Sequence, residues 1–370
     1  KKVAPSRLAR ERKAQVRGLL AFSLTVFFIK IMWLSSKEGR GLLGADGENY
    51  LQGLEGLLSE GFFSSAEKLS YWPAGYPILM WPIAAITENN LAFIVGIIQS
   101  LIFALAIWFF AAELSATSLK RFAWPAAITL SLSPTLSLNS VVIGYEVTSA
   151  SLFLLAISLF LRQVRSSKSS ILNWENSLAA FAISISCFMQ PRILLLALGI
   201  IIPFAIYHYR GRAISIFVAF TLSIVAIAPS IMILRNVEAN GYAAISTNLG
   251  VTMNLGAGDN ATGGYGGSTS KAGVPCVTNG NSAQQDNQRV KCVLGWYLEN
   301  PTKSLKLFYN KSIYFWSPWF GPVANGTMAR NPWLTISPIK SMTSTQEGIN
   351  TVYGNFGKLV SWTWLIGGLA

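Results

Sequence analysis

Three carboxylates beside apolar runs are the residues of this sequence best suited to acid–base chemistry. Asp46 and Glu48 stand two positions apart in GADGENYL, shortly after the first apolar run, and Glu146 stands in GYEVTSAS at the start of a later one. A carboxylate within hydrogen-bond reach of a hydroxyl can take its proton in a transfer reaction. Because the chain has only 16 acidic residues in 370, we select Asp46, Glu48 and Glu146 as the candidate catalytic residues.

Three basic residues occupy the corresponding ends of apolar runs. Lys30 lies in the first run, Arg192 in MQPRILLL and Arg235 in ILRNVEANG. Arginine binds phosphate oxygens through two parallel hydrogen bonds, and charges at membrane depth usually face a cavity or a partner. The acidic and basic residues together therefore predict a site for a phosphorylated ligand. Acid–base pairing that only holds helices together is the structural alternative for any one pair.

The composition is that of a polytopic membrane protein. Hydrophobic residues make up 52% of the chain and charged residues only 12%, whereas soluble domains carry about 25% charged residues. The mean hydropathy is +0.43. The formal net charge of +13 does not indicate nucleic-acid binding, because that function needs a basic stripe on a soluble module. Here the basic residues form short clusters between apolar runs.

The apolar runs predict an all-α bundle of transmembrane helices. A helical span needs roughly 20 mostly apolar residues, and seven segments reach or approach that length: 18–36, 91–114, 122–140, 147–162, 174–190, 192–207 and 213–234. An eighth begins near residue 357 and is cut at Ala370, so we expect the natural chain to continue. The first span is too long for a removable signal peptide and lacks a small-residue cleavage site, so we expect it to remain as an anchor.

The distribution of Lys and Arg predicts the orientation of the bundle, because basic flanks stay on the cytoplasmic side. Fourteen such residues lie in the N-terminal segment and in the connections after the second, fourth and sixth spans, whereas the short connections of the other side carry only Arg192. The expected parts are a basic cytoplasmic segment 1–17, a transmembrane module 18–234 with a first extracytoplasmic loop 37–90, an extracytoplasmic segment 235–356, and the start of a further transmembrane helix at 357–370. Asp46 and Glu48 then lie at the extracytoplasmic mouth of the bundle.

The first outer loop contains two predicted interfacial helices. Leucine and tyrosine residues recur at helical spacing after Asp46 and Gly47, which could cap that helix, and Gly61 ends it. The segment 76–87, YPILMWPIAAIT, is too short to span and is expected to be interfacial or re-entrant. The alternative is that both helices merely cover the bundle.

The second outer segment changes in composition at Arg235. Residues 235–300 are rich in Gly, Asn, Ser and Thr, and they include the run NLGAGDNATGGYGG at 254–267. Glycines permit positive φ angles and close backbone approach, so this composition predicts a shaped loop rather than a strand or helix. A flexible connection is the alternative.

The three cysteines predict a disulfide rather than a metal site. Cys276 and Cys292 share the outer segment and could close a loop in an oxidising compartment. Cys187 lies in the fifth span and is most simply a small buried residue. The single histidine, His208, is expected on the cytoplasmic side, so Cys and His build no metal site.

The order of these features resembles the GT-C superfamily of integral-membrane glycosyltransferases, particularly bacterial relatives of the aminoarabinose lipid A transferase and the protein O-mannosyltransferases. The matching pieces are Asp46 with Tyr50 four residues on, WPAGYP, Glu146 before the fourth span, QPRILLL, RN at 235–236, and ISTNLGVTMNLGAGDNATGGY. The resemblance covers residues 18 to 315. In place of the adjacent Asp-Glu pair of the O-mannosyltransferases, this chain has Asp46-Gly47-Glu48, and the C-terminal helices are missing.

The resemblance implies an inverting transfer of a sugar from a polyprenyl-phosphate carrier to an acceptor hydroxyl. The transfer would take place on the extracytoplasmic side of the membrane, which in bacteria would be the inner membrane. Asp46 would be the general base, and Glu48 or Glu146 would orient hydroxyls. The departing phosphate would be neutralised by Arg192, Arg235 and Lys30. The substrate pocket would include Tyr50, Tyr76, Asn254 and Tyr265, the last as a stacking face.

Two other classes of function remain open. A transporter or flippase could use the same outer charges to guide an ion or a lipid headgroup. Transporters often show internal repeats with broken helices at mid-membrane, and the sequence shows neither a repeat nor mid-span charges beyond Lys30. A non-catalytic scaffold could bind a partner through the outer segment. The sugar and the acceptor, whether lipid, glycan or protein, stay undetermined. A divalent metal such as Mg or Mn held by Asp46 and Glu48 is a further alternative, since hard cations prefer carboxylate oxygens.

Overall fold

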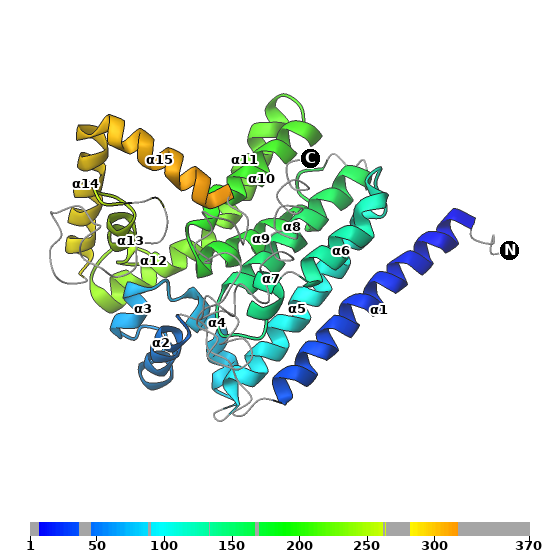
Figure 1. Ribbon diagram of the computed structural model, residues 1–370, viewed down its shortest axis with the longest axis horizontal. Coiled ribbons are helices and arrows are strands. Elements are labelled where there is room, and N and C mark those ends of the chain that lie inside the picture. The colour runs from blue at the N-terminus through cyan, green and yellow to red at the C-terminus, as the bar shows by residue number, and fades with distance from the viewer. Residues whose placement is uncertain are drawn as a thin grey trace. The chain divides into compact units, whose positions relative to one another are not determined.

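The computed structural model describes residues 7–36, 46–87, 90–132, 134–166, 170–261, 263 and 282–316, and every element in these ranges is a helix (Figure 1). The chain forms two compact units. The first comprises residues 1–66 and 73–245, and the second comprises residues 67–72 and 246–370. Each unit has its own hydrophobic core.

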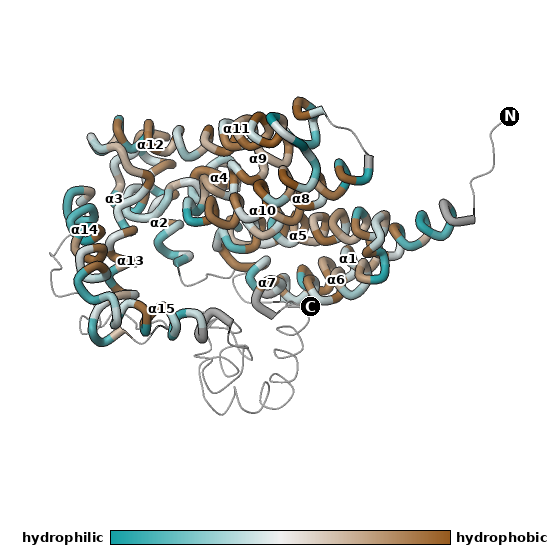
Figure 2. Tube along the Cα trace, turned by 90° about the horizontal axis from the view of Figure 1, so that it is seen from above, coloured by the Kyte–Doolittle hydropathy of each residue, from teal (hydrophilic) through white to brown (hydrophobic). Residues whose placement is uncertain are grey.

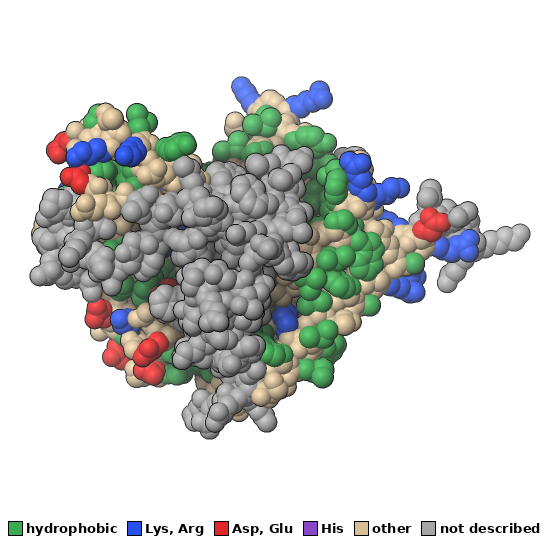
Figure 3. Space-filling model, viewed as in Figure 1, with side chains coloured by type: hydrophobic (Ala, Val, Ile, Leu, Met, Phe, Trp, Pro, Cys, Tyr) green, Lys and Arg blue, Asp and Glu red, His purple; other side chains and the backbone are tan. Residues whose placement is uncertain are grey.

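Four stretches of the described residues are long and apolar enough to cross a membrane. They are Arg10–Ser35 within α1 (Arg7–Ser35), α5 (Leu91–Leu114), Glu146–Arg165 within α8 (Glu146–Ser166), and Arg212–Asn240, which joins α11 (Arg212–Val225) to α12 (Ile227–Asn240). Hydrophobic residues fill much of α5, α8 and α11 (Figure 2). Hydrophobic side chains also follow α1, whose N-terminal end carries basic ones (Figure 3). These stretches are compatible with the predicted membrane protein, whose orientation stays a prediction.

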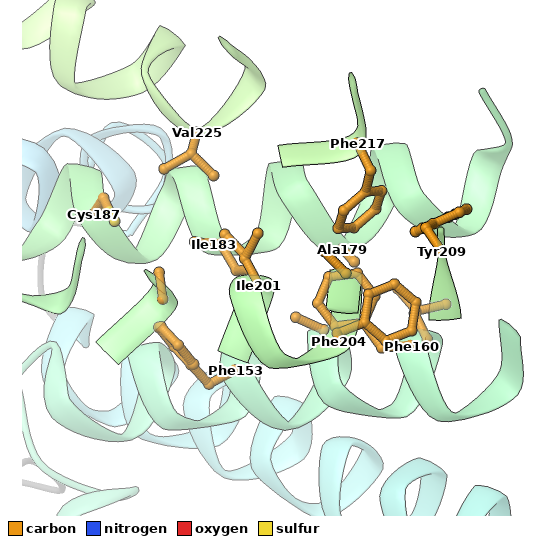
Figure 4. Packing of buried hydrophobic residues seen from close by; sticks show 14 residues of the cluster. Phe153, Phe160, Ala179, Ile183, Cys187, Ile201, Phe204, Tyr209, Phe217 and Val225 are labelled. Atoms are coloured by element: carbon orange, nitrogen blue, oxygen red, sulfur yellow. The ribbon is translucent and has the colours of Figure 1, made fainter. Parts of the chain in front are cut away.

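Helices α8 to α11 build the main core of the first unit. Helices occur at the spans expected at 174–190 and 192–207, as α9 (Trp174–Met189) and α10 (Ile193–His208). Each has 16 residues and is not among the four stretches long and apolar enough to cross a membrane, so their spanning role stays a prediction. Fourteen buried residues from this part of the chain form one cluster (Figure 4). Within it Phe160 stacks on Phe204, with ring centroids 4.3 Å apart. Cys187 belongs to the same cluster and has a free thiol, which agrees with its expected role as a small buried residue.

The segment expected as one helix over 122–140 is helical on both sides of residue 133, which lies outside the described residues. Its described parts are a short 3-10 helix, η2 (Lys120–Phe122), and two α-helical stretches, α6 (Ala123–Leu132) and α7 (Pro134–Asn139). The single span over this segment stays a prediction.

The helix expected over 213–234 is interrupted and extends further than predicted, to Asn240. Pro229 accounts for the interruption, because a proline ring inside a helix displaces the carbonyl four residues earlier. That carbonyl belongs to Val225, the last residue of α11. The hydroxyl of Ser184 on α9 donates to it at 3.1 Å, so a neighbouring helix satisfies the acceptor that the proline frees.

The first outer loop forms helices at both predicted segments, α2 (Gly47–Glu60) and α4 (Gly75–Ala84). Asp46 occupies the N-cap position of α2, but its side chain makes no capping hydrogen bond, so the expected side-chain cap is wrong. Helix α2 ends at Gly61, as predicted. Helix α4 packs closely on the end of α9, where an added Cβ at Gly75 would lie 2.1 Å from the carbonyl oxygen of Phe188.

The second unit contains α3 (Glu67–Tyr71), α13 (Leu249–Leu255), α14 (Ala283–Glu299) and α15 (Pro301–Trp316). The expected loop character of residues 235–300 is therefore wrong for α13 and α14. A capping box of Ser282 and Gln285 starts α14, and its Ser-x-x-Gln pattern is visible in the sequence. A carboxylate oxygen of Asp286 accepts from the N–H groups of Gly250 at 2.7 Å and Val251 at 3.3 Å, so α14 caps the start of α13.

Candidate functional site

Asp46 and Arg192 form the charged centre of a site within the first unit. Asp46 directly precedes α2, and Arg192 directly precedes α10 in the turn after α9. Burial raises the pKa of the Asp46 carboxyl above its usual range, and the positive charge of Arg192 acts in the opposite direction and lowers it. Asp46 is half-buried and Arg192 is exposed, so neither charge is sealed from solvent.

Glu146 joins this pair around Tyr145. It is the first residue of α8 and is exposed. Burial raises the pKa of the Tyr145 hydroxyl; the negative charges of Glu146 and Asp46 raise it further, while Arg192 lowers it. The charges of all three groups therefore act on this one hydroxyl. The Glu146 carboxylate also lies against Gly144, where an added Cβ would be 2.6 Å from Oε2.

Gln190 links Arg192 to Tyr145 through hydrogen bonds. Its side-chain Nε2 donates to the Tyr145 hydroxyl at 2.9 Å, and its Oε1 accepts from Arg192 Nε at 3.4 Å. Its backbone N–H donates to the Ser186 carbonyl at 3.0 Å, which fixes Gln190 at the end of α9. One carboxamide therefore orients two members of the site.

Three tyrosines form an aromatic wall beside the charges. Tyr50 meets Tyr76 and Tyr145 edge to face, with ring centroids 5.1 Å and 6.4 Å apart. Tyr50 and Tyr76 are each 3% exposed, and burial raises the pKa of both hydroxyls. The Tyr76 hydroxyl donates to Gln99 and accepts from the Gly144 N–H, both at 2.9 Å. It therefore supports the wall, and the substrate contact expected of Tyr76 does not fit this burial.

Glu48 does not join Asp46 in the site. It is exposed on the first turn of α2, whereas Asp46 is half-buried and the charge of Arg192 acts on its carboxyl. The two carboxylates thus have different surroundings, although only Gly47 separates them in the chain. This arrangement favours Glu146, rather than Glu48, as the second carboxylate of the site.

The structure corrects the role expected for Arg235. Its side chain is fully buried. Its Nε donates to the Phe62 carbonyl at 3.1 Å, Nη1 donates to Asn236 Oδ1 at 2.6 Å, and Nη2 donates to the Ser64 carbonyl. The guanidinium therefore fastens the turn after α2 to α12, and a phosphate cannot reach it in this arrangement.

Lys30 lies at a contact between helices. Its ammonium donates to Ser140 Oγ at 2.7 Å and stands 5.2 Å from the centroid of the Phe103 ring. Ser140 Oγ is also 3.0 Å from Ser100 Oγ of α5. These contacts attach α1 to α5 and to the residues before α8, which gives Lys30 a packing role instead of the expected phosphate contact.

The remaining predicted residues belong to the second unit. Asn254 lies on α13 with its side chain buried. Cys292 lies on α14 and is disulfide-bonded. Tyr265 and Cys276 lie outside the described residues, so the stacking role of the tyrosine and the pairing of Cys276 with Cys292 stay predictions.

Sequence reasoning missed three members of the site, although each left a signal. Tyr145 adjoins the selected Glu146 in GYEV, Gln190 opens the quoted QPR, and Gln99 is an amide inside the apolar run 91–114. A buried amide in such a run needs hydrogen-bond partners, so Gln99 could have been selected on that ground.

The chain matches no protein-family model, and no curated protein or solved structure gives a significant match to it. The chemistry of the residues around Asp46 and Arg192 therefore carries the assignment of function.

Proposed function

We propose that this protein is an inverting membrane glycosyltransferase of the GT-C type, which moves a sugar from a polyprenyl-phosphate carrier to an acceptor hydroxyl outside the cytoplasm. The carrying observation is the half-buried Asp46 carboxylate, whose pKa the positive charge of the exposed Arg192 lowers, together with the hydrogen bonds through which Gln190 links Arg192 to Tyr145. A base for a hydroxyl and a cation for a leaving phosphate are the two groups that such a transfer needs side by side.

Asp46 and Arg192 have separate roles in the proposed reaction. Asp46 takes the proton of the acceptor hydroxyl as its oxygen attacks the anomeric carbon of the sugar. The bond from that carbon to the phosphate oxygen breaks, and the lipid phosphate leaves with the bonding electrons, stabilised by Arg192. Attack from the face opposite the phosphate inverts the anomeric centre. The raised pKa of Asp46 makes its carboxylate a stronger base than that of an ordinary aspartate.

Glu146 and the aromatic wall supply the acceptor side of the site. The Glu146 carboxylate is exposed and acts on the same tyrosine hydroxyl as Asp46. A second carboxylate so placed can accept a hydrogen bond from a sugar or acceptor hydroxyl and orient it toward the base. Tyr145, which is only half-buried, would present a ring edge and its hydroxyl to the same substrate, whereas the buried Tyr50 packs against the Tyr145 ring.

The position of these residues along the helices suits a lipid-borne donor. Glu146 begins α8, and Arg192 lies in the turn between α9 and α10. Helix ends are where a membrane protein meets the headgroup region, which is also the depth of a carrier phosphate. With the N-terminus in the cytoplasm, as its basic residues predict, this end of the first unit is extracytoplasmic in a bacterial inner membrane.

The proposal is tested with the purified chain in lipid nanodiscs and a set of radiolabelled polyprenyl-phosphate sugars. Asp46→Asn should reduce transfer about 100- to 10,000-fold and leave donor binding intact, because asparagine keeps the shape and loses the proton acceptor. Glu48→Gln is the matched control, since it removes the same charge two residues away at an exposed position.

Near-normal turnover by Asp46→Asn would remove Asp46 from the mechanism. Lipid movement across the bilayer without transfer by the wild-type chain would favour a flippase. Binding of the donor with neither activity would favour a scaffold.

A further inference from the structure

The segment between α7 and α8 is held by a closed ring of hydrogen bonds. Gln99 of α5 donates from Nε2 to the Val142 carbonyl at 2.8 Å and accepts at Oε1 from the Tyr76 hydroxyl at 2.9 Å. The Tyr76 hydroxyl in turn accepts from the Gly144 N–H at 2.9 Å. Two side chains thus hold a carbonyl and an N–H that lie two residues apart on the same segment.

A fourth contact extends the ring to the start of α8. The Thr148 hydroxyl donates to Gln99 Oε1 at 3.0 Å, and Thr148 lies in the first turn of that helix. Gln99 is 4% exposed and Tyr76 is 3% exposed. Water therefore competes poorly for these bonds, and losing one leaves a buried polar group without its partner.

The held segment delivers two members of the site. Tyr145 and Glu146 follow directly after Gly144, and the Glu146 carboxylate lies against the Gly144 backbone. The ring therefore fixes the backbone on which this carboxylate rests. Helix α4, which carries Tyr76, is itself set close to the end of α9 through Gly75.

We infer that Gln99 and Tyr76 are positioning residues that hold the 142–144 backbone so that Glu146 and Tyr145 face Asp46 and Arg192. Neither side chain touches the substrate in this role. The inference rests on the proposed function for its catalytic consequence: the pair sets acceptor orientation, which depends on Glu146, and does not set donor binding, which depends on Arg192.

A second tyrosine provides a matched control. The Tyr209 hydroxyl accepts from Gln163 Nε2 at 2.9 Å and from Asn176 Nδ2 at 3.0 Å, and Tyr209 is 4% exposed. Gln163 lies 17 residues after Glu146 on α8, which is about 25 Å along the helix. Tyr209→Phe thus removes a comparable buried hydroxyl at the far end of the same unit.

Hydrogen exchange of the peptide covering residues 140–148 tests whether the pair holds this segment, and it needs no activity. Tyr76→Phe and Gln99→Leu should each speed exchange there by at least about fivefold, the equilibrium factor of one typical net hydrogen bond. Tyr209→Phe should leave the same peptide unchanged. Equal exchange of this peptide in wild type and Tyr76→Phe would overturn the inference.

Kinetics then test the catalytic consequence, with the donor and acceptor that the transfer assay identifies. Tyr76→Phe should raise the acceptor KM several-fold at an unchanged donor KM. A merely structural role would instead lower the apparent kcat, because less of the protein would be folded. That second outcome is the one expected for Tyr209→Phe. An unchanged acceptor KM in Tyr76→Phe would overturn the positioning role. A wild-type chain without transferase activity would instead overturn the proposed function, and the exchange comparison would still decide whether the ring holds the segment.

Discussion

Replacement of Arg235 by methionine tests whether this arginine fastens the fold or binds ligand. Methionine approximates the length of the aliphatic stem and removes the guanidinium. The change deletes hydrogen bonds to the Phe62 and Ser64 carbonyls and to the Asn236 amide. The turn after α2 then loses its attachment to α12, while Arg192 keeps its hydrogen bond to Gln190.

The expected cost follows from these three bonds. A hydrogen bond to a charged group contributes about 1.5–3 kcal/mol, but the variant also avoids the cost of burying a guanidinium. Removing one partner from a buried charged arrangement typically costs about 3–5 kcal/mol, and we expect Arg235→Met to lie in that range. At about 2–4 °C per kcal/mol for a unit of 150–250 residues, Tm should fall by roughly 6–20 °C.

The assay compares Arg235→Met with Arg192→Met in the same detergent, measuring Tm by intrinsic fluorescence and the affinity for a polyprenyl phosphate below Tm. Arg192 is exposed and makes one side-chain hydrogen bond at 3.4 Å, so its loss should change stability within about 0.5 kcal/mol and weaken phosphate binding. Arg235→Met should lower Tm and leave phosphate binding unchanged. A wild-type Tm together with lost phosphate affinity in Arg235→Met would refute the fastening role and return Arg235 to the binding site.

Three further perturbations address other parts of the two units. In Arg192→Gln, the pKa of Asp46 should rise, because the positive charge that lowers it is gone. Since the base works only when ionised, the acid limb of the kcat–pH profile should move to higher pH. A shift to lower pH would contradict the interaction between Arg192 and Asp46. Gly144→Ala should leave Tm nearly unchanged, since the clashing atom is the end of the exposed Glu146 side chain, but should lower turnover; an unchanged rate would argue against a role for that carboxylate. Asp286→Ala should destabilise the second unit by about 1–2 kcal/mol through loss of a helix cap, whereas Asp286→Asn, which keeps an acceptor oxygen, should cost less than half as much in a denaturation experiment.

The sequence by itself predicted a membrane protein, with which the apolar helices are compatible, and it predicted most of the described helices. Composition and apolar run length are local properties, so they predicted the membrane-compatible stretches and the two helices of the first outer loop. They also selected Asp46, Glu146 and Arg192, because charges beside apolar runs are rare in this chain. The interruption before Pro229 is equally local, because a proline ring inside a helix displaces the carbonyl four residues earlier.

Only the tertiary structure decided which of the selected charges act together. Arg192 and Arg235 look alike in the sequence, since each stands at the end of an apolar run. Arg192 is exposed and its charge acts on Asp46, whereas Arg235 is enclosed by carbonyls from a turn about 170 residues earlier. Asp46 and Glu48 differ in the same way, although one residue separates them. Burial and hydrogen-bond partners come from segments far apart in the chain, so residue type and spacing alone do not determine whether a charge supports the fold or faces a ligand.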